Sequence, residues 1–490
     1  MSLSLVIVML NNVTLNVALP DLSTELSADN SELQWIMDAY ALVFGGTLLV
    51  MGALGDRFGR KGALQVGLVI VGAASAWTAL YADSSSDVIL ARATMGLGAA
   101  LVMPSTLSVL LVVFPPEERG KAIGIWAAMA GVGAPIGLLL GGWAVETYDW
   151  QMVFLINVPI IIIALGAGAI IVPRSKDEQG RPLDIIGAFL SVIALASLLY
   201  AIIEGPSLSW TDSEVLGSFG LSIVAGFSFV FWQKRAEHPL LPLEFFKNPR
   251  FTIGLIAIAM AFFVMFSFMF MQMLHFQLVR GHSPFSAALR FFPLPIGLMP
   301  AAANSDRLVA KFGRSNVISV GLCLVATGLF LFTLVTMDTS YLQIAATFFL
   351  LGLGMGLTMA PSTTAVMDAI PESKAGVGSA TNDASREVGG ALGIAIGGSV
   401  LNEVYQSNIL IPESLSAQSA IISESFPAAI KIGENMLALG NSDGALLIQS
   451  ARESFIEGMV AACLVAGIVA LVAAIIVKWK LPQDMPASEE

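Results

Sequence analysis

The sequence is poor in charge, cysteine and histidine. Asp, Glu, Lys and Arg make up only 12% of its 490 residues, about half of their usual share in a soluble domain. The two cysteines, Cys323 and Cys463, both lie in apolar runs, which favours packing between helices over a disulfide or a metal site. The three histidines are too scattered to predict a metal centre. A nucleotide-binding loop of the Gly-x4-Gly-Lys-Ser/Thr type is also missing, so the sequence does not predict a primary pump.

Long apolar runs occupy most of the chain. Hydrophobic residues make up 56% of it, and the mean hydropathy is +0.80. Runs near twenty residues recur, for example at 62–82, 152–172 and 459–477. Each is long enough to cross about 30 Å of hydrocarbon at about 1.5 Å per residue. We therefore predict an all-α polytopic membrane protein and no enzyme, and the net charge of −12 does not favour nucleic acid as a partner.

Charged residues and Pro/Gly clusters divide the chain into fourteen predicted spans. They cover residues 3–20, 34–55, 62–81, 87–113, 121–145, 152–172, 183–203, 215–233, 251–274, 285–306, 316–336, 341–367, 376–402 and 455–478. Eighteen of the 24 Lys and Arg residues then fall in loops on the side of the N-terminus, and only three fall in the opposite loops. This asymmetry predicts that both termini lie in the cytoplasm. The stretch 403–454, of mixed polarity, is then a long extracytoplasmic loop, predicted to be partly helical.

The sequence repeats itself at a spacing near 255 residues. Three blocks recur in the same order: 58–60 as 312–314, 96–106 as 352–363, and the glycines of 133–142 as those of 389–398. The repeat predicts two related six-helix bundles, residues 1–172 and 251–480. Two inserted transmembrane helices with cytoplasmic linkers (173–250) separate the bundles, and a cytoplasmic tail (481–490) follows. Parallel six-helix repeats around a central site are a transporter plan for alternating access.

The loop after the second span carries a ten-residue motif, Gly52-Ala-Leu-Gly-Asp56-Arg57-Phe-Gly59-Arg60-Lys61. It resembles the cytoplasmic signature of the major facilitator superfamily. The glycines allow a tight turn and close helix approach. Asp56 and the basic cluster form a predicted conformational latch that holds one state and breaks in the other. An ordinary basic cytoplasmic loop is the alternative.

Further stretches narrow the resemblance to the fourteen-span drug:proton antiporters. They are Asn16-Val-Ala-Leu-Pro20, Gln34-Trp-Ile-Met-Asp38-Ala-Tyr40, the block from Arg92 to Gly98, Asn157-Val-Pro159, Gly281-His-Ser-Pro284 and the segment 379–390. The resemblance covers nearly the whole chain and is closest to the quaternary-ammonium efflux branch. It implies a monomer in the cytoplasmic membrane that exports lipophilic, cationic drugs or antiseptics in exchange for protons, driven by the proton motive force without a cofactor. A dedicated exporter of an endogenous metabolite, antibiotic or lipid is one alternative, and a non-transporting sensor or scaffold is another.

The fifth predicted span contains a glycine-rich stretch with one proline. Its motif residues are Gly133, Pro135, Gly137, Gly141 and Gly142, and they resemble the family's antiporter motif. Glycines four residues apart let helices touch backbone to backbone, and Pro135 can bend the span. A packing role and a direct role in switching both remain open.

Ionisable side chains inside spans are functional candidates, because each costs at least about 2.5 kcal/mol at the bilayer centre. The spacing of Asp383 and Glu387 puts both carboxyls on one face of the thirteenth span. Two acids close together in a low dielectric repel each other, which favours uptake of a proton by one of them. The same carboxylate can attract a lipophilic cation. Arg386, between them in sequence, leaves a structural ion pair as the alternative.

Arg92 matches the family's membrane arginine, and because arginine stays charged it is a predicted fixed partner for a carboxylate. The resemblance implies that such a carboxylate lies in the first span. This sequence has Asn11 there, and an amide cannot carry a proton through a cycle. Asp38 is therefore the candidate that shares proton coupling with the acids of the thirteenth span. An interfacial helix end is the alternative reading of Asp38.

Five residues are candidates for a substrate cavity: Asn11, Asn16, Met265, Phe266 and Met269. Flexible thioethers and aromatic faces suit a promiscuous cavity that binds cations. The ninth span is apolar on all sides, however, which favours a lipid-facing and packing surface for its three members.

Overall fold

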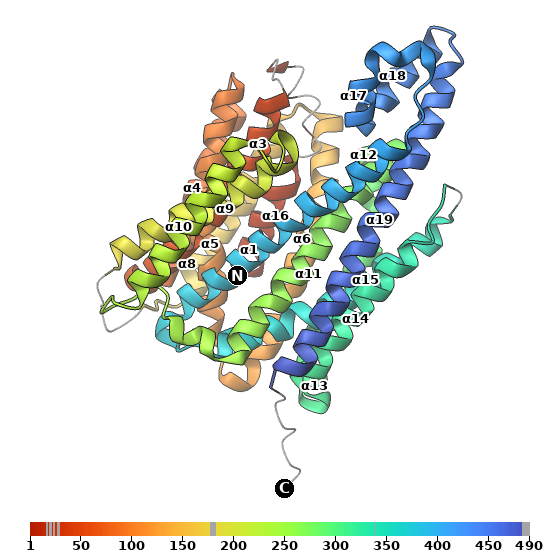
Figure 1. Ribbon diagram of the computed structural model, residues 1–490. Coiled ribbons are helices and arrows are strands. Elements are labelled where there is room, and N and C mark those ends of the chain that lie inside the picture. Colours follow the sequence, from red (N-terminus) through yellow and green to blue (C-terminus); the bar gives the residue numbers. More distant parts are fainter. Residues whose placement is uncertain are drawn as a thin grey trace.

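The computed structural model describes residues 1–15, 18, 22, 25, 26, 30–176, 183–337 and 339–482. Within these ranges the chain forms helices and no strand (Figure 1). Twelve helical segments are long and apolar enough to cross a membrane. They comprise α3 (Asn30–Phe58), α4 (Arg60–Tyr81), α5 (Ser85–Val113), α7 (Gln151–Leu155) with α8 (Asn157–Ile171), α9 (Ile185–Leu208), α10 (Ser213–Gln233), α11 (Pro249–Leu274) with η2 (His275–Val279), α12 (Pro284–Leu289) with α13 (Pro293–Phe312), α14 (Arg314–Phe332), α15 (Tyr341–Asp368), η3 (Glu372–Lys374) with α16 (Ala375–Asn408), and α19 (Asp443–Lys480).

The remaining helices are α1 (Ser2–Val13), α6 (Pro116–Thr147), η1 (Leu243–Lys247), η4 (Glu413–Gln418), α17 (Ser419–Glu424) and α18 (Phe426–Ala438). The last three lie within the stretch 403–454, so the prediction that this stretch is partly helical is confirmed. In Figure 1, α17 and α18 lie beside the end of α19 that is far from the C-terminus. We call the face at which α19 ends, at Lys480, the C-terminal face.

Local sequence explains where several helices begin and bend. Ser84 accepts a hydrogen bond from the Asp87 backbone and so caps α5, and Asp184 caps α9 in the same way. Pro104 lies inside α5, and its counterpart in the repeat, Pro361, lies inside α15. A proline inside a helix removes a backbone hydrogen bond, which packed membrane helices tolerate. The two halves thus interrupt the same helix at corresponding positions.

Glycines form two equivalent seams between helices. A β-carbon on Gly133 of α6 would lie 2.7 Å from the Met9 side chain of α1. A β-carbon on Gly393 of α16 would overlap the Phe263 carbonyl of α11. Only glycine permits such close approach of two backbones. The repeated glycine block therefore packs α6 on α1 in the first half and α16 on α11 in the second.

The second half has an aromatic core. Its ring contacts have centroid distances of 5.1–6.1 Å and join Phe268, Phe276, Phe291, Phe332 and Phe348. Most of these rings are edge to face, an arrangement that aromatic pairs favour. Helix α11 thereby packs inward against α14 and α15.

The two cysteines differ in their surroundings. Cys463 is buried on α19, whereas Cys323 is exposed on α14. The prediction that both pack between helices is therefore right for Cys463 and wrong for Cys323. An apolar run in a membrane helix continues around all sides, so it does not reveal which side faces the neighbouring helices.

Candidate functional site

Two charged residues predicted from the thirteenth span lie together deep inside the protein. The side chains of Asp383 and Arg386 on α16 are 1% and 2% exposed, and Arg386 Nη1 lies 3.7 Å from Asp383 Oδ1. This separation gives an ion pair but exceeds the length of a hydrogen bond. Asp383 Oδ1 accepts a hydrogen bond of 3.3 Å from Asn382 Nδ2. Among the described residues, Asp383 Oδ2 and Arg386 Nε have no hydrogen-bond partner.

Arg386 is held mainly by groups that carry no charge. Its Nη2 donates to Thr363 Oγ1 of α15 at 3.3 Å. Its guanidinium carbon lies 4.6 Å from the ring centroid of Trp126 on α6 and 5.2 Å from that of Phe262 on α11. Because α6 belongs to the first half of the repeat and α16 to the second, the guanidinium lies at the contact between the halves. The guanidinium therefore binds the Asp383 carboxylate only weakly.

Glu387, the second predicted acid, is half-buried on the side of α16 that meets α3. A β-carbon on Gly45 of α3 would lie 3.6 Å from the Glu387 β-carbon. Tyr40, one turn earlier on α3, is near enough to interact electrostatically with Glu387. Its ring also lies under Arg92, with 4.5 Å between the guanidinium carbon and the centroid. Tyr40 therefore connects the acids of α16 with the arginine of α5.

Arg92 is 1% exposed, and the hydrogen bonds it donates go to backbone carbonyls. They reach Asn11 O at 2.7 Å, Ile36 O at 3.0 Å and Met37 O at 3.4 Å. Arg92 thus fastens α5 to α1 and α3. Asp38, predicted to share in coupling, is half-buried on α3 and within electrostatic range of Arg92. Its role in coupling stays a prediction.

Asn11, which replaces the acid that the resemblance implies, lies in a neutral hydrogen-bond network. Its Nδ2 donates to Ile7 O at 2.9 Å, and its Oδ1 accepts from Asn157 Nδ2 at 3.2 Å. The side chain is 4% exposed. Arg92 contacts the backbone of Asn11 rather than its amide, so arginine binding at this position does not require a carboxylate.

The predicted latch joins the two halves at the C-terminal face. Asp56 Oδ2 on α3 accepts hydrogen bonds from Gly376 N at 2.7 Å and Val377 N at 3.2 Å, at the start of α16. Backbone N–H groups at a helix start lack partners within the helix and favour a negative charge. Gly52 makes the approach possible, because a β-carbon there would lie 2.8 Å from the Ala380 β-carbon.

Basic residues of the motif have separate roles in this contact. Arg60 Nε donates to Asp56 Oδ1 at 2.9 Å, and Arg60 also donates to Glu372 O across the two halves. Arg119, which the sequence analysis did not select, forms an ion pair with the Glu372 carboxylate. Asp306, the repeat counterpart of Asp56, lies against Gly120 near the start of α6. Both halves thus place an aspartate against the first turns of the opposite α6 or α16.

Three other motif residues make contacts within the first half. Arg57 is half-buried with its guanidinium 5.3 Å from the ring centroid of Phe58. Gly59 adopts φ +121°, a conformation that favours glycine, at the turn between α3 and α4. Lys61 donates to Ala169 O of α8 at 2.6 Å. These three shape the loop within the first half.

The antiporter-motif glycines line the first glycine seam. Gly137 and Gly141 face Leu10 of α1 and Thr14 at its C-terminal end, and Gly142 lies against Phe285 of α12. Helix α6 runs without a break through Pro135. The geometry supports the packing role, and a role in switching stays a prediction.

The cavity candidates are only partly brought together. Met265, Phe266 and Met269 are half-buried on α11, and Phe266 lies directly over Gly390 of α16. Phe266 also packs on Phe262, with 5.7 Å between the ring centroids. Asn16 lies outside the described residues. Phe266 is therefore the candidate that lies nearest to the Arg386 cluster.

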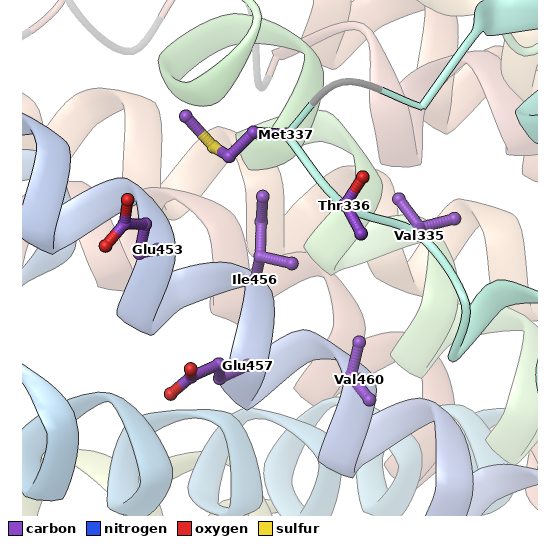
Figure 2. Close-up of a pocket in the computed structure, with 7 residues that line it drawn as sticks. All are labelled: Val335, Thr336, Met337, Glu453, Ile456, Glu457 and Val460. Atoms are coloured by element: carbon purple, nitrogen blue, oxygen red, sulfur yellow. The ribbon is translucent and has the colours of Figure 1, made fainter.

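A separate pocket of about 360 Å³ opens beside α19, away from the charged cluster (Figure 2). Ile456 and Val460 face the loop between α14 and α15, whereas the carboxylates of Glu453 and Glu457 point to another side of the helix. Both glutamates are exposed, and they bond to the neutral amides of Gln449 and Asn408. None of the predicted site residues lines this pocket.

Sequence reasoning missed Trp126, Thr106, Thr363 and Tyr40. Two signals were present: Thr106 and Thr363 end the repeated Pro-Ser-Thr block, and Tyr40 ends one of the stretches that carry the resemblance. The contact of Trp126 with Arg386 has no signal in the sequence, because it depends on how α6 packs on the second half, against α13 and α15.

Comparison with known proteins shows to which class of protein this chain belongs. The family model described as the Major Facilitator Superfamily matches residues 1–394. The chain belongs to this superfamily, and it is a membrane transporter rather than an enzyme. The predicted superfamily and the all-helical fold are confirmed.

Individual relatives extend over almost the whole chain. It is 30% identical over 479 residues to the multidrug efflux pump LfrA of Mycolicibacterium smegmatis, covering 97% of this chain and 94% of LfrA. It is 32% identical over 454 residues to the methyl viologen resistance protein SmvA of Salmonella typhimurium, covering 92% and 90%. The crystal structure of the human organic anion transporter MFSD10 matches with a TM-score of 0.62 at 13% identity over 97% of each chain, which shows a shared fold.

Proposed function

We propose that this protein is a proton-coupled antiporter that exports lipophilic, cationic compounds across the cytoplasmic membrane by alternating access. The observation that carries the proposal is the buried, loosely paired Asp383 and Arg386 at the contact between the two halves. A buried ionisable group inside a span is costly and needs a function or a firm partner. Asp383 has an oxygen without a hydrogen-bond donor among the described residues, so it can accept a proton without breaking an existing bond.

Similar proteins support the substrate class. Relatives that match over nearly the full chain are named a multidrug efflux pump and a methyl viologen resistance protein, and methyl viologen is an organic dication. The acids of α16 and the aromatic side chains Trp126, Phe262 and Phe266 suit such cargo, since cations bind both carboxylates and ring faces. Proton and cation then compete for the same carboxyl groups.

We further propose fourteen spans, with α1 and α6 added to the twelve apolar segments. Helix α6 has 32 residues, or about 48 Å at 1.5 Å per residue, which exceeds the hydrocarbon thickness. Helix α1 begins the remaining span. Residues 1–172 and 251–480 then form the two six-helix bundles, with α9 and α10 inserted between them. This count puts both termini in the cytoplasm and makes the C-terminal face cytoplasmic.

The proposed orientation assigns a state to the structure. Asp56 holds the start of α16, and Arg119 pairs with Glu372, on the cytoplasmic side. The structure therefore corresponds to a state closed toward the cytoplasm. Opening toward the cytoplasm requires these contacts to break, so they contribute to the free-energy difference between the closed and open states. The protein works as a monomer in this scheme, because each chain contains both halves.

Reconstitution into lipid vesicles tests the proposal. The purified protein is placed in vesicles with an acidic interior, and ethidium uptake is followed together with internal pH. We expect uptake to depend on the gradient, to be accompanied by proton efflux, and to be lost in Asp383→Asn and Glu387→Gln. Glu457→Gln, which changes an exposed glutamate on α19, is the matched control and should transport normally.

Three outcomes would contradict the proposal. Unchanged coupling in both α16 variants would show that these acids do not carry the proton. Flux of a single metabolite with no dye uptake would indicate a dedicated exporter. No flux of any compound would indicate a sensor or scaffold.

A further inference from the structure

A continuous chain of four buried side chains crosses the contact between the halves. Trp126 Nε1 of α6 donates to Thr106 Oγ1 of α5 at 3.0 Å. The Trp126 ring lies under the Arg386 guanidinium at 4.6 Å, and Arg386 donates to Thr363 Oγ1 of α15 at 3.3 Å. Trp126 is 1% exposed, and both threonines are fully buried. The contact between ring and guanidinium is the step that joins the first half to the second.

The two ends of this chain correspond in the repeat. Thr106 follows Pro104 by two residues, and Thr363 follows Pro361 by two residues. Thr106 is also anchored to its own helix, since its hydroxyl donates to Met103 O at 2.7 Å. Each half thus supplies one threonine on the helix interrupted by proline, and each threonine orients one side chain of the next helix of that half.

We propose that Trp126 is a positioning residue for proton coupling, which holds Arg386 away from Asp383 while the C-terminal face is closed and releases it when the halves separate there. This inference rests on the proposed function. Trp126 is well placed for such a role, because two residues earlier Gly124 packs on the backbone of Ala302 in α13. Separation of α6 from α13 therefore moves Trp126 with it.

Trp126, Thr363 and Asp383 compete for one cation, the guanidinium of Arg386. In the closed state Arg386 is shared among a hydroxyl, two rings and a carboxylate at 3.7 Å. A desolvated cation–π contact contributes about 2 kcal/mol, close to the value of a hydrogen bond to a charged group. When Trp126 leaves, Arg386 gains by closing the remaining distance to Asp383. A hydrogen-bonded arginine favours the ionised carboxylate, so the Asp383 proton passes to water on the side that has just opened.

Few titratable groups bear on this step. On α16 they are Arg386, Asp383 and Glu387 themselves, which interact electrostatically with one another. Helix α3 adds Tyr40, which faces Glu387. Helices α6, α11 and α15 contribute Trp126, Phe262 and Thr363, none of which titrates. Movement of Arg386 is therefore the main change in the electrostatics of Asp383 as α6 moves.

The test measures the external pH dependence of proton-driven ethidium transport in vesicles. Trp126→Leu removes the ring, Trp126→Phe keeps an aromatic face, and Thr106→Val removes only the group that orients the indole. Trp150→Phe, which alters an equally buried tryptophan of the first half, is the matched control. We expect the pH of half-maximal transport to fall by about 1.5 units in Trp126→Leu, as loss of a desolvated cation–π contact would give. Thr106→Val and Trp126→Phe each lose the hydrogen bond between Trp126 and Thr106 but keep an aromatic face at position 126, so both should give a smaller shift in the same direction. Trp150→Phe should stay near the wild type.

The outcomes separate this inference from the proposed function. If Trp126→Leu and Thr106→Val change only the maximal rate, with the pH profile intact, Trp126 is a packing residue and the inference fails. The proposed function survives that result as long as Asp383→Asn still abolishes coupling. If Trp126→Leu does not fold, the comparison of Thr106→Val with Trp150→Phe decides in the same way.

Discussion

Replacement of Asp56 by asparagine should open the C-terminal face. The carboxylate accepts two hydrogen bonds from the start of α16 in the other half, at 2.7 and 3.2 Å. Asparagine can still accept such bonds, but without a charge. The ion pair between Asp56 and Arg60 lies within the first half, since the two residues are four apart at the α3–α4 turn. This ion pair persists in either state. Of the bonds that Asp56 makes, the two that cross between the halves are therefore those that the substitution changes in the equilibrium.

The size of the effect follows from these two bonds. A hydrogen bond to a charged group contributes about 1.5–3 kcal/mol and a neutral one about 0.5–1.5 kcal/mol, so each bond loses roughly 1 kcal/mol. The total of about 2 kcal/mol corresponds to a change of about 30-fold in the ratio of open to closed molecules, since 1.4 kcal/mol is tenfold. A population that is almost entirely closed would then become a mixture.

Distances between spin labels measure this population. Lys121 on α6 and Lys480 on α19 are exposed at the C-terminal face and belong to different halves. Both are changed to cysteine in a background with Cys323→Ser and Cys463→Ala, and pulsed electron resonance then gives the distance distribution. We expect a second, longer distance in Asp56→Asn. Asp212→Asn is the control, because Asp212 accepts a hydrogen bond from Glu214 N at the start of α10 without joining the halves. An Asp56→Asn distribution identical to that of the parent would refute the latch reasoning.

Three further predictions concern other parts of the molecule. Gly393→Ala should lower the midpoint of thermal unfolding in detergent by several degrees, because its β-carbon would overlap the backbone of Phe263. Gly398→Ala is the control: its β-carbon would meet only a Phe270 ring atom at 3.9 Å, so the midpoint should not change. Arg92→Lys should reduce transport at least tenfold and destabilise the first half, since an ammonium cannot span the three carbonyls of α1 and α3 that the guanidinium binds; normal transport would contradict this. Asn11→Asp puts a carboxylate beside Asn157 and Arg92. It should raise the number of protons exchanged per dye molecule, which is measured from the internal pH. An unchanged ratio would show that residue 11 cannot take part in proton exchange.

Helix positions could be predicted from sequence largely because the bilayer imposes a length. Twelve helical segments of the described residues are long and apolar enough to cross a membrane, and each overlaps one predicted span, whereas the count of fourteen stays a prediction. Hydropathy reports only the part of a helix inside hydrocarbon. The last span was predicted at 455–478, and α19 begins twelve residues earlier, at Asp443. Polar residues 443–454 continue the helix outside the apolar region, where a hydropathy pattern cannot distinguish helix from loop.

Proximity among the candidate residues was predictable where they share one helix. The i, i+4 spacing placed Asp383 and Glu387 on one face, and charge in an apolar run singled out Arg92 and Arg386. Contacts between helices could not be predicted in the same way. Trp126 reaches Arg386 across the contact between the two halves, where α6 packs on α13 and α15. Arg119 pairs with a residue 253 positions away. The repeat indicated which helices correspond, but it carried no information on which side chains meet.

The length of α19 has a practical consequence. Its 38 residues extend over about 57 Å, well beyond the thickness of a bilayer, and α18 packs on its projecting part through Gly433 and Gly444. The hairpin formed by α18 and the projecting part of α19 is a recognisable feature on a protein of 51.5 kDa that is otherwise largely embedded in detergent or lipid. Because the hairpin packs on helices of the second half, an antibody fragment raised against it would mark particle orientation in electron microscopy while leaving both transport states accessible for imaging.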